Sequence, residues 1–145
     1  MAQHWLSGGV MRVVIPVEPV GKQRPRTVRT KEGRVVTFTP PRTVWTENLI
    51  RHRVMELGEY FERDVPLRVE LTFYRQRPKS VPKKVRLPVS RPDWDNYAKL
   101  VMDALEKYAY HNDSQITTAI VQKRFGEPPR IEICLEEDEK QEWLV

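Results

Sequence analysis

The segment PLRVELTFYRQRP alternates apolar and polar residues, and this alternation constrains the fold more than any other feature of the chain. Its apolar residues at every second position are Leu67, Val69, Leu71 and Phe73. Successive side chains of a strand point to opposite faces of a sheet, so the segment predicts a strand with only one face toward a core. A sheet of this kind needs helices packed on its apolar face.

Four other segments predict strands and two predict helices. The expected strands are 11–19, 34–40, 114–125 and 130–137. Apolar residues recur near the helical period over 43–61 (Val44, Ile50, Val54, Leu57 and Phe61) and over 93–108. The order β-β-α-β-α-β-β predicts an α+β fold, a single domain over 1–145 with two main helices on a mixed sheet of about five strands. We expect residues 1–10 and 137–145 to be flexible ends.

Basic residues are concentrated in two loops. The chain has a net charge of +5, although its last ten residues hold five acids and one lysine. Residues 22–34 include six basic side chains and one acid, and residues 75–91 include seven basic side chains and no acid. Such charge attracts polyanions, most commonly nucleic acid, although a solvated basic surface would have the same composition. The candidates for phosphate contacts are Lys22, Arg24, Arg26 and Arg91.

The segment RPDWDNYAKLVMDAL, residues 91–105, predicts an amphipathic helix with two acids at its start. The residues that would face the core are Tyr97, Val101, Ala104, Leu105 and Tyr108. Asp95, Lys99 and Asp103 would project from the opposite side, and Asp93 precedes them directly after a proline. We expect a structural role for Asp103.

Two interpretations of Asp93 and Asp95 are open on the sequence alone. An Asp at a helix start can cap free backbone N–H groups, and Asp95 with Lys99 is an ordinary i,i+4 ion pair that contributes roughly 0.2–0.5 kcal/mol. Capping accounts for one acid, but two acids so close repel each other unless a cation lies between them. The second interpretation is a Mg²⁺ site, which Asp113 in the turn YHNDSQI would complete.

A metal site of this composition fits phosphodiester hydrolysis. Ions held by Asp93, Asp95 and Asp113 would lower the pKa of a bound water and offset the charge of the phosphate. Lys99, one turn along the helix, would stabilise transition-state charge or orient the attacking water. The basic loops would hold the nucleic-acid backbone without reading its sequence.

Other sites and locations are disfavoured by the composition. One cysteine and three scattered histidines argue against zinc, and Cys134, in the apolar run IEICL, predicts a buried small hydrophobe. No segment is long and apolar enough to cross a bilayer, and the first ten residues do not resemble a signal peptide. We therefore expect a cytoplasmic protein.

The segment RPDWDNYAKLVMDALEKYAYHNDSQI resembles the RusA family of Holliday-junction resolvases, whose signature is close to R-P-D-x-D-N-x-x-K-x-x-x-D-A-L followed, after a short gap, by D-D-x-Q. The loop GKQRPR and the TFTP segment after it are similar to the same family, so the resemblance covers most of residues 12–135. The chain departs from the signature at Asn112, where the family usually has the first of two acids.

The resemblance implies a small homodimeric endonuclease that depends on Mg²⁺, with Mn²⁺ as a substitute, and that nicks four-way DNA junctions symmetrically. Its metal-binding acids would be Asp93, Asp95 and Asp113, and its catalytic lysine would be Lys99. Two alternatives remain open: a metal-dependent nuclease for other branched DNA or for RNA, and a basic nucleic-acid-binding module without activity.

Overall fold

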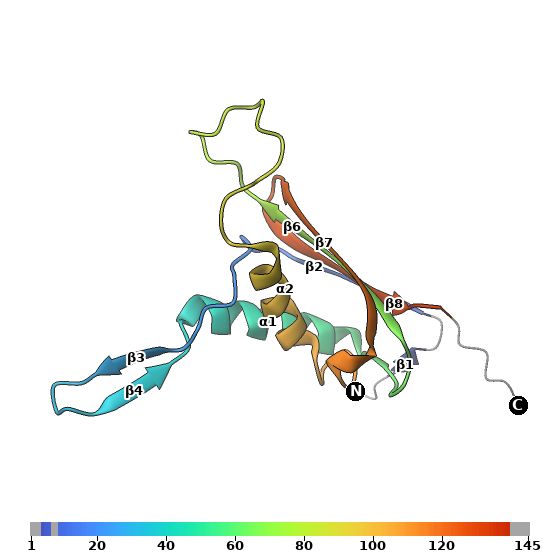
Figure 1. Ribbon diagram of the computed structural model, residues 1–145. Coiled ribbons are helices and arrows are strands. Elements are labelled where there is room, and N and C mark those ends of the chain that lie inside the picture. Colours follow the sequence, from blue (N-terminus) through green and yellow to red (C-terminus); the bar gives the residue numbers. More distant parts are fainter. Residues whose placement is uncertain (1–3, 7–8, 140–145) are drawn as a thin grey trace, which may run out of the picture.

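The computed structural model describes residues 4–6 and 9–139 and has the α+β fold that the sequence predicts. Both helices lie on one side of a curved sheet, while a two-stranded ribbon and a long loop extend away from it (Figure 1). The elements in chain order are β1 (His4–Leu6), β2 (Val10–Ile15), β3 (Arg26–Arg29), β4 (Val35–Phe38), α1 (Pro41–Leu57), β5 (Glu59–Phe61), β6 (Leu67–Arg75), α2 (Trp94–Leu105), the 3₁₀ helix η1 (Asp113–Gln115), β7 (Ile116–Phe125) and β8 (Arg130–Glu137).

The main sheet has four strands in the order β2-β8-β6-β7. The last strand of the chain, β8, lies between β2 and β6 and is antiparallel to both. In contrast, β6 and β7 are parallel, so the chain must cross the sheet between them, and α2 lies on this crossover. The expected strand at 34–40 is present as β4, but it pairs with β3 outside the main sheet.

The apolar face of β6 forms the centre of the core. Leu67, Val69, Leu71 and Phe73 are all buried, as the alternation predicts. Phe73 stacks on Tyr97 of α2, with ring centroids 4.7 Å apart and planes 12° apart. This contact fixes the helix over the sheet at its first turn, close to the two acids of the motif.

The predicted extents of both helices are partly wrong. α1 ends at Leu57 because Gly58 adopts a left-handed conformation with φ of 67°, and Phe61 is buried in β5 instead of in a helix. Val44 and Leu57, expected in the core, are exposed. α2 ends at Leu105, and the exposed Tyr108 lies beyond it.

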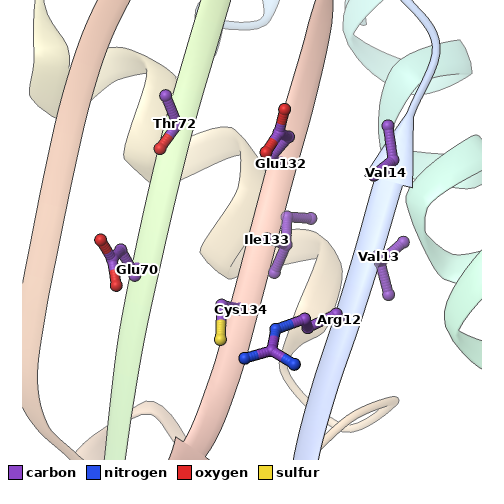
Figure 2. A pocket seen from close by; sticks show the side chains of 8 residues that line it. All are labelled: Arg12, Val13, Val14, Glu70, Thr72, Glu132, Ile133 and Cys134. Carbon is purple, nitrogen blue, oxygen red and sulfur yellow. The ribbon is translucent and has the colours of Figure 1, made fainter.

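On the opposite face of the sheet, no helix of residues 4–6 and 9–139 is present (Figure 1). Figure 2 looks onto this face, where side chains of β2, β6 and β8 surround a shallow hollow of about 210 Å³. Cys134 lies here and is only partly buried, so the prediction of a buried core cysteine is wrong. The reason is the register of β8, in which Ile133 and Leu135 take the core side.

The ribbon of β3 and β4 is the part of the fold that the sequence predicts least well. Residues 26–29 were expected to be a loop, yet they form four antiparallel pairs with β4. Every residue of both strands is exposed. The ribbon therefore contributes nothing to the core of the described chain and projects into solvent (Figure 1).

The expected flexible ends lie partly beyond the structure. Residues 1–3, 7–8 and 140–145 are outside the described residues. Inside the described part, β1 pairs in parallel with β5, and Glu137 is the last residue of β8. Neither helix of the described residues has the length and apolar character needed to span a membrane.

Candidate active site

The two acids of the motif lie at the N-terminus of α2 with exposed side chains. Asp93 is the N-cap residue, but its side chain makes no capping hydrogen bond. Instead, its backbone carbonyl accepts hydrogen bonds from the N–H groups of Asn96 and Tyr97, at 3.1 and 3.2 Å. Side-chain capping therefore does not account for Asp93. Both carboxylates are exposed to solvent at the start of the helix.

The segment before Asp93 is held by two basic residues from the sheet. Arg75 of β6 and Lys123 of β7 both donate to the backbone carbonyl of Ser90, at 3.1 and 2.8 Å. Burial and the charge of Arg75 lower the pKa of Lys123, and the carboxylate of Asp93 opposes this shift. Neither cation is predicted from the sequence as a site residue. Their position near the carboxyl ends of neighbouring parallel strands is the signal that would have found them.

A cleft of about 250 Å³ forms where the loop GKQRPR meets the start of α2. The residues that line it are Gly21, Lys22, Gln23, Arg91, Pro92, Asp93 and Asn96. The N–H of Lys22 donates to the carbonyl of Asn96 at 3.0 Å. A side chain at Gly21 would place its Cβ 3.1 Å from Cβ of Pro92, so glycine favours this close approach. The structure thus brings the two sequence motifs together.

Lys22 points inward, toward acids of both helices. Its Nζ donates to Oε2 of Glu47 at 2.9 Å and lies 3.3 Å from Oδ2 of Asp103. The same Asp103 oxygen is 3.8 Å from Nζ of Lys99, whose side chain remains 63% exposed. Burial works against the charge of Lys22, but the hydrogen bond and ion pair with Glu47, with a further contribution from Asp103, raise its pKa overall. Glu47, only 8% exposed, was not predicted as part of the site.

Asp113 lies near the other end of α2. Its N–H donates to Oε2 of Glu106, the C-cap residue of the helix, at 2.9 Å. The hydroxyl of Tyr110 donates to its Oδ1 at 2.5 Å. Burial raises the pKa of Asp113 above its usual range, and the charges of Glu106 and Asp103 act in the same direction, although the Tyr110 hydrogen bond opposes them.

Asn112, which departs from the family signature, has a structural function here. Its side chain accepts a hydrogen bond from the N–H of Ser114 at 2.9 Å and caps η1. Gln115 completes a reciprocal capping box and is itself buried, donating to the carbonyls of Glu62 and Val65. An asparagine oxygen caps a helix as well as a carboxylate does, so the local geometry does not require an acid at this position.

The three predicted metal ligands do not meet within the described part of the chain. Asp93 and Asp95 lie at the start of a helix of 12 residues, and Asp113 lies beside its end. Among residues 4–6 and 9–139, no three His, Cys, Asp or Glu side chains form a group that could hold a metal ion. Mg²⁺ commonly takes one or two protein carboxylates together with water and phosphate oxygens. The exposed Asp pair fits such an ion, whereas a set of three acids does not form within the described part of one chain.

Comparisons with known proteins agree with the motif. A protein of Bacillus subtilis called "Uncharacterized protein YqaN" is 30% identical to the chain over 130 residues, which cover 83% of this chain and 91% of that protein. The "Crossover junction endodeoxyribonuclease rusA" of Lactococcus phage r1t is 38% identical over 83 residues, which cover 54% of this chain and 60% of the phage protein.

The family model for the endodeoxyribonuclease RusA matches residues 16–136, which include both sequence motifs, both helices, β6, β7 and all of β8 except its last residue, but not the edge strand β2. This range contains every residue of the cleft and of the lysine–acid contacts described above. The chain belongs to the RusA family of endodeoxyribonucleases, and it is a hydrolytic nuclease.

Proposed function

We propose that the protein is a Mg²⁺-dependent endonuclease that resolves four-way DNA junctions by paired nicks. The observation that supports this most directly is the exposed pair of carboxylates, Asp93 and Asp95, at the edge of a cleft that also contains Arg91. Lys99 lies on the same helix, with most of its side chain in solvent. Carboxylates suited to a metal ion and cations suited to a phosphate thus lie on or beside the same helix.

Asp93 and Asp95 would hold the ion, with Mn²⁺ as a possible substitute for Mg²⁺. When bound, the ion supplies an activated water and neutralises charge on the phosphate. Arg91 would hold the phosphate beside the Asp pair, because its side chain lines the same cleft. Lys99 would donate to the oxygen on which negative charge develops.

The DNA would lie along the basic ribbon and its root. Arg24 and Arg26 are exposed at the start of the ribbon, and its other basic residues continue toward the tip. A two-stranded ribbon is narrow enough to enter the major groove of a duplex. We therefore keep Arg24, Arg26 and Arg91 as proposed phosphate contacts, whereas Lys22, proposed from the sequence, already binds two acids.

The protein would act as a homodimer, with Asp113 of one copy completing the site of the other. Because a helix of 12 residues is about 18 Å long, Asp113 is remote from the Asp pair of its own chain. Asp113 lines an apolar groove of about 220 Å³ between α2 and the edge strand β7, beside Trp94, Ala98 and Met102. Trp94 is 60% exposed. A second copy seated on this groove would cover these apolar side chains, and a two-fold dimer matches the approximate symmetry of a junction.

The proposal is tested by incubating the protein with an end-labelled synthetic four-way junction and with a linear duplex of the same sequence, with and without Mg²⁺. We expect paired nicks in the junction alone and only with the metal. Cutting of both substrates would show that the protein is a nuclease with another target, such as other branched DNA or RNA. Binding without cutting under any divalent metal would reject the proposal. The protein would then be interpreted as a basic nucleic-acid-binding module without activity.

A further inference from the structure

Lys22 connects three parts of the fold that are far apart in sequence. Its backbone is bound to Asn96 in the first turn of α2, and its side chain reaches Glu47 of α1 and Asp103 of α2. The chain continues directly from Lys22 into the β3–β4 ribbon. The side chain of Lys22 is 24% exposed and that of Glu47 is 8% exposed, so this contact is largely removed from solvent.

Asp103 is shared between two lysines. Lys22 and Lys99 approach the same oxygen, Oδ2, at 3.3 and 3.8 Å. The two lysines and the two acids, Glu47 and Asp103, balance in charge. If Lys22 were neutral, Asp103 would have Lys99 as its nearest cation, since both lie on one face of α2, four residues apart.

From this arrangement we infer that Lys22 is a positioning residue for the nuclease reaction: by binding Asp103 and Glu47, it weakens the pairing of Asp103 with Lys99, so that the ammonium group of Lys99 can reach the DNA phosphate. The inference rests on the proposed function, in which Lys99 acts on the phosphate. It assigns Lys22 a different role from the phosphate contact that its position in a basic loop predicts. It also gives the buried Glu47 a role, because Glu47 fixes Lys22 at its place beside Asp103.

The test must not leave a buried acid without its cation, because such a variant would be strongly destabilised. The double variant Lys22→Met/Glu47→Gln removes both charges and keeps the volumes of both side chains. Cleavage of the labelled four-way junction is measured under single-turnover conditions over a range of protein concentrations, which separates the cleavage rate from junction binding. Tm is recorded for each variant.

We expect the double variant to cleave about tenfold more slowly, with junction affinity close to that of the wild type. Adding Asp103→Asn to the double variant removes the acid that would capture Lys99, and we expect the cleavage rate to return to near the wild-type value. A merely structural role of Lys22 would not be repaired by a third substitution. Loss of rate without recovery in the triple variant would overturn the inference.

A phosphate-binding role for Lys22 predicts a different outcome. The double variant would then bind the junction more weakly, the slope of log affinity against log salt would fall by about one, and the cleavage rate of the bound junction would be unchanged. That result would also overturn the inference. Lys99→Met is measured in the same assay: full activity of this variant would reject the proposed role of Lys99 itself. Loss of activity there, with an unaffected double variant, would reject only the role of Lys22.

Discussion

Asp93 and Asp95 owe their positions to neighbouring residues more than to hydrogen bonds of their own carboxylates. Arg75 and Lys123 hold the carbonyl of Ser90, and Tyr97 stacks on the sheet. Because these contacts do not involve the carboxylate of Asp95, a substitution that only removes its charge should leave the helix in place.

Asp95→Asn is expected to reduce junction cleavage on the order of a hundredfold or more, because a neutral amide is a poor ligand for a hard divalent ion. Junction binding should be unchanged or tighter, since one negative charge near the phosphates is removed. Cleavage and gel-shift assays on the same labelled junction measure the two effects. Asp64→Asn is a matched control, because Asp64 is exposed in a turn with φ of 67°, which asparagine tolerates. Normal cleavage by Asp95→Asn would contradict the metal site.

A second prediction at the residue scale concerns stability and pH. The hydroxyls of Thr117 and Thr118 both donate to Oδ2 of Asp138 at 2.7 Å, and these two hydrogen bonds lower the pKa of Asp138 below its usual value. A lowered pKa in the folded state stabilises the protein above the unfolded-state pKa, and this contribution is lost as the pH falls through the folded-state value. Asp138→Asn should therefore lower Tm at pH 7, and the difference from the wild type should shrink as the pH falls below the usual pKa of an aspartate. A difference that stays the same as the pH is lowered would show that charge is not the cause.

At the scale of elements, the ribbon and the body of the protein have separate tasks. The residues of β3 and β4 are exposed on both faces, and the core is complete without them. A hairpin that packs against nothing is only marginally stable in water. Its contribution should therefore be found in DNA binding and not in the stability of the fold.

Replacing residues 27–37 by two glycines should leave Tm nearly unchanged, because Arg26 and Phe38 are already paired and a two-residue turn can join them. Junction binding should weaken, and its dependence on salt should become less steep, because Arg29, Lys31 and Arg34 are lost. Binding as a function of salt concentration measures both effects. A large fall in Tm would mean that the ribbon supports the fold, and unchanged salt dependence would mean that it does not contact phosphate.

The sequence predicts well those elements whose buried face is visible as an apolar pattern within a single segment. The alternation of β6 and the apolar side of α2 from Tyr97 to Leu105 were predicted because each pattern records one buried face. The end of α1 was mispredicted, since Gly58 stops the helix although apolar residues continue at helical spacing to Phe61. Of the ribbon, β4 was predicted as a strand, but β3 and its pairing with β4 were not, because a strand exposed on both faces leaves no apolar period.

The same distinction holds for the site. The residues of the motif on α2 could be recognised in sequence because they are close together there. Glu47 and Lys123 could not, because they come from other elements and meet the motif only in the folded chain. The position of Asp113 depends on where α2 ends, which the sequence placed three residues too late.

At the scale of the whole molecule, the separation of the acids predicts complementation between two inactive variants. If Asp113 of one copy completes the site of the other, a mixed dimer of Asp95→Asn and Asp113→Asn chains contains one intact site. Each variant alone should be inactive, and the mixture should recover nicking of one strand without the paired second cut. Denaturing gels of the doubly end-labelled junction measure this.

The control uses the proposed dimer surface. Met102→Lys, which places a charge in the apolar groove, should yield monomers by analytical ultracentrifugation and should abolish complementation. Met55→Lys, on the exposed side of α1, should change neither property. A mixture without activity, formed by variants that still dimerise, would contradict a site shared between copies.

The place of β8 in the sheet also has a consequence for how the protein is made. β8 follows every other described strand in the chain, yet it lies between β2 and β6 and pairs with both. Until β8 leaves the ribosome, β2 has no partner in the main sheet, although α2 can already contact α1 and Lys22. Pairings between such distant segments form slowly and late. A nascent chain therefore cannot complete the sheet that supports the nuclease site before β8 is available.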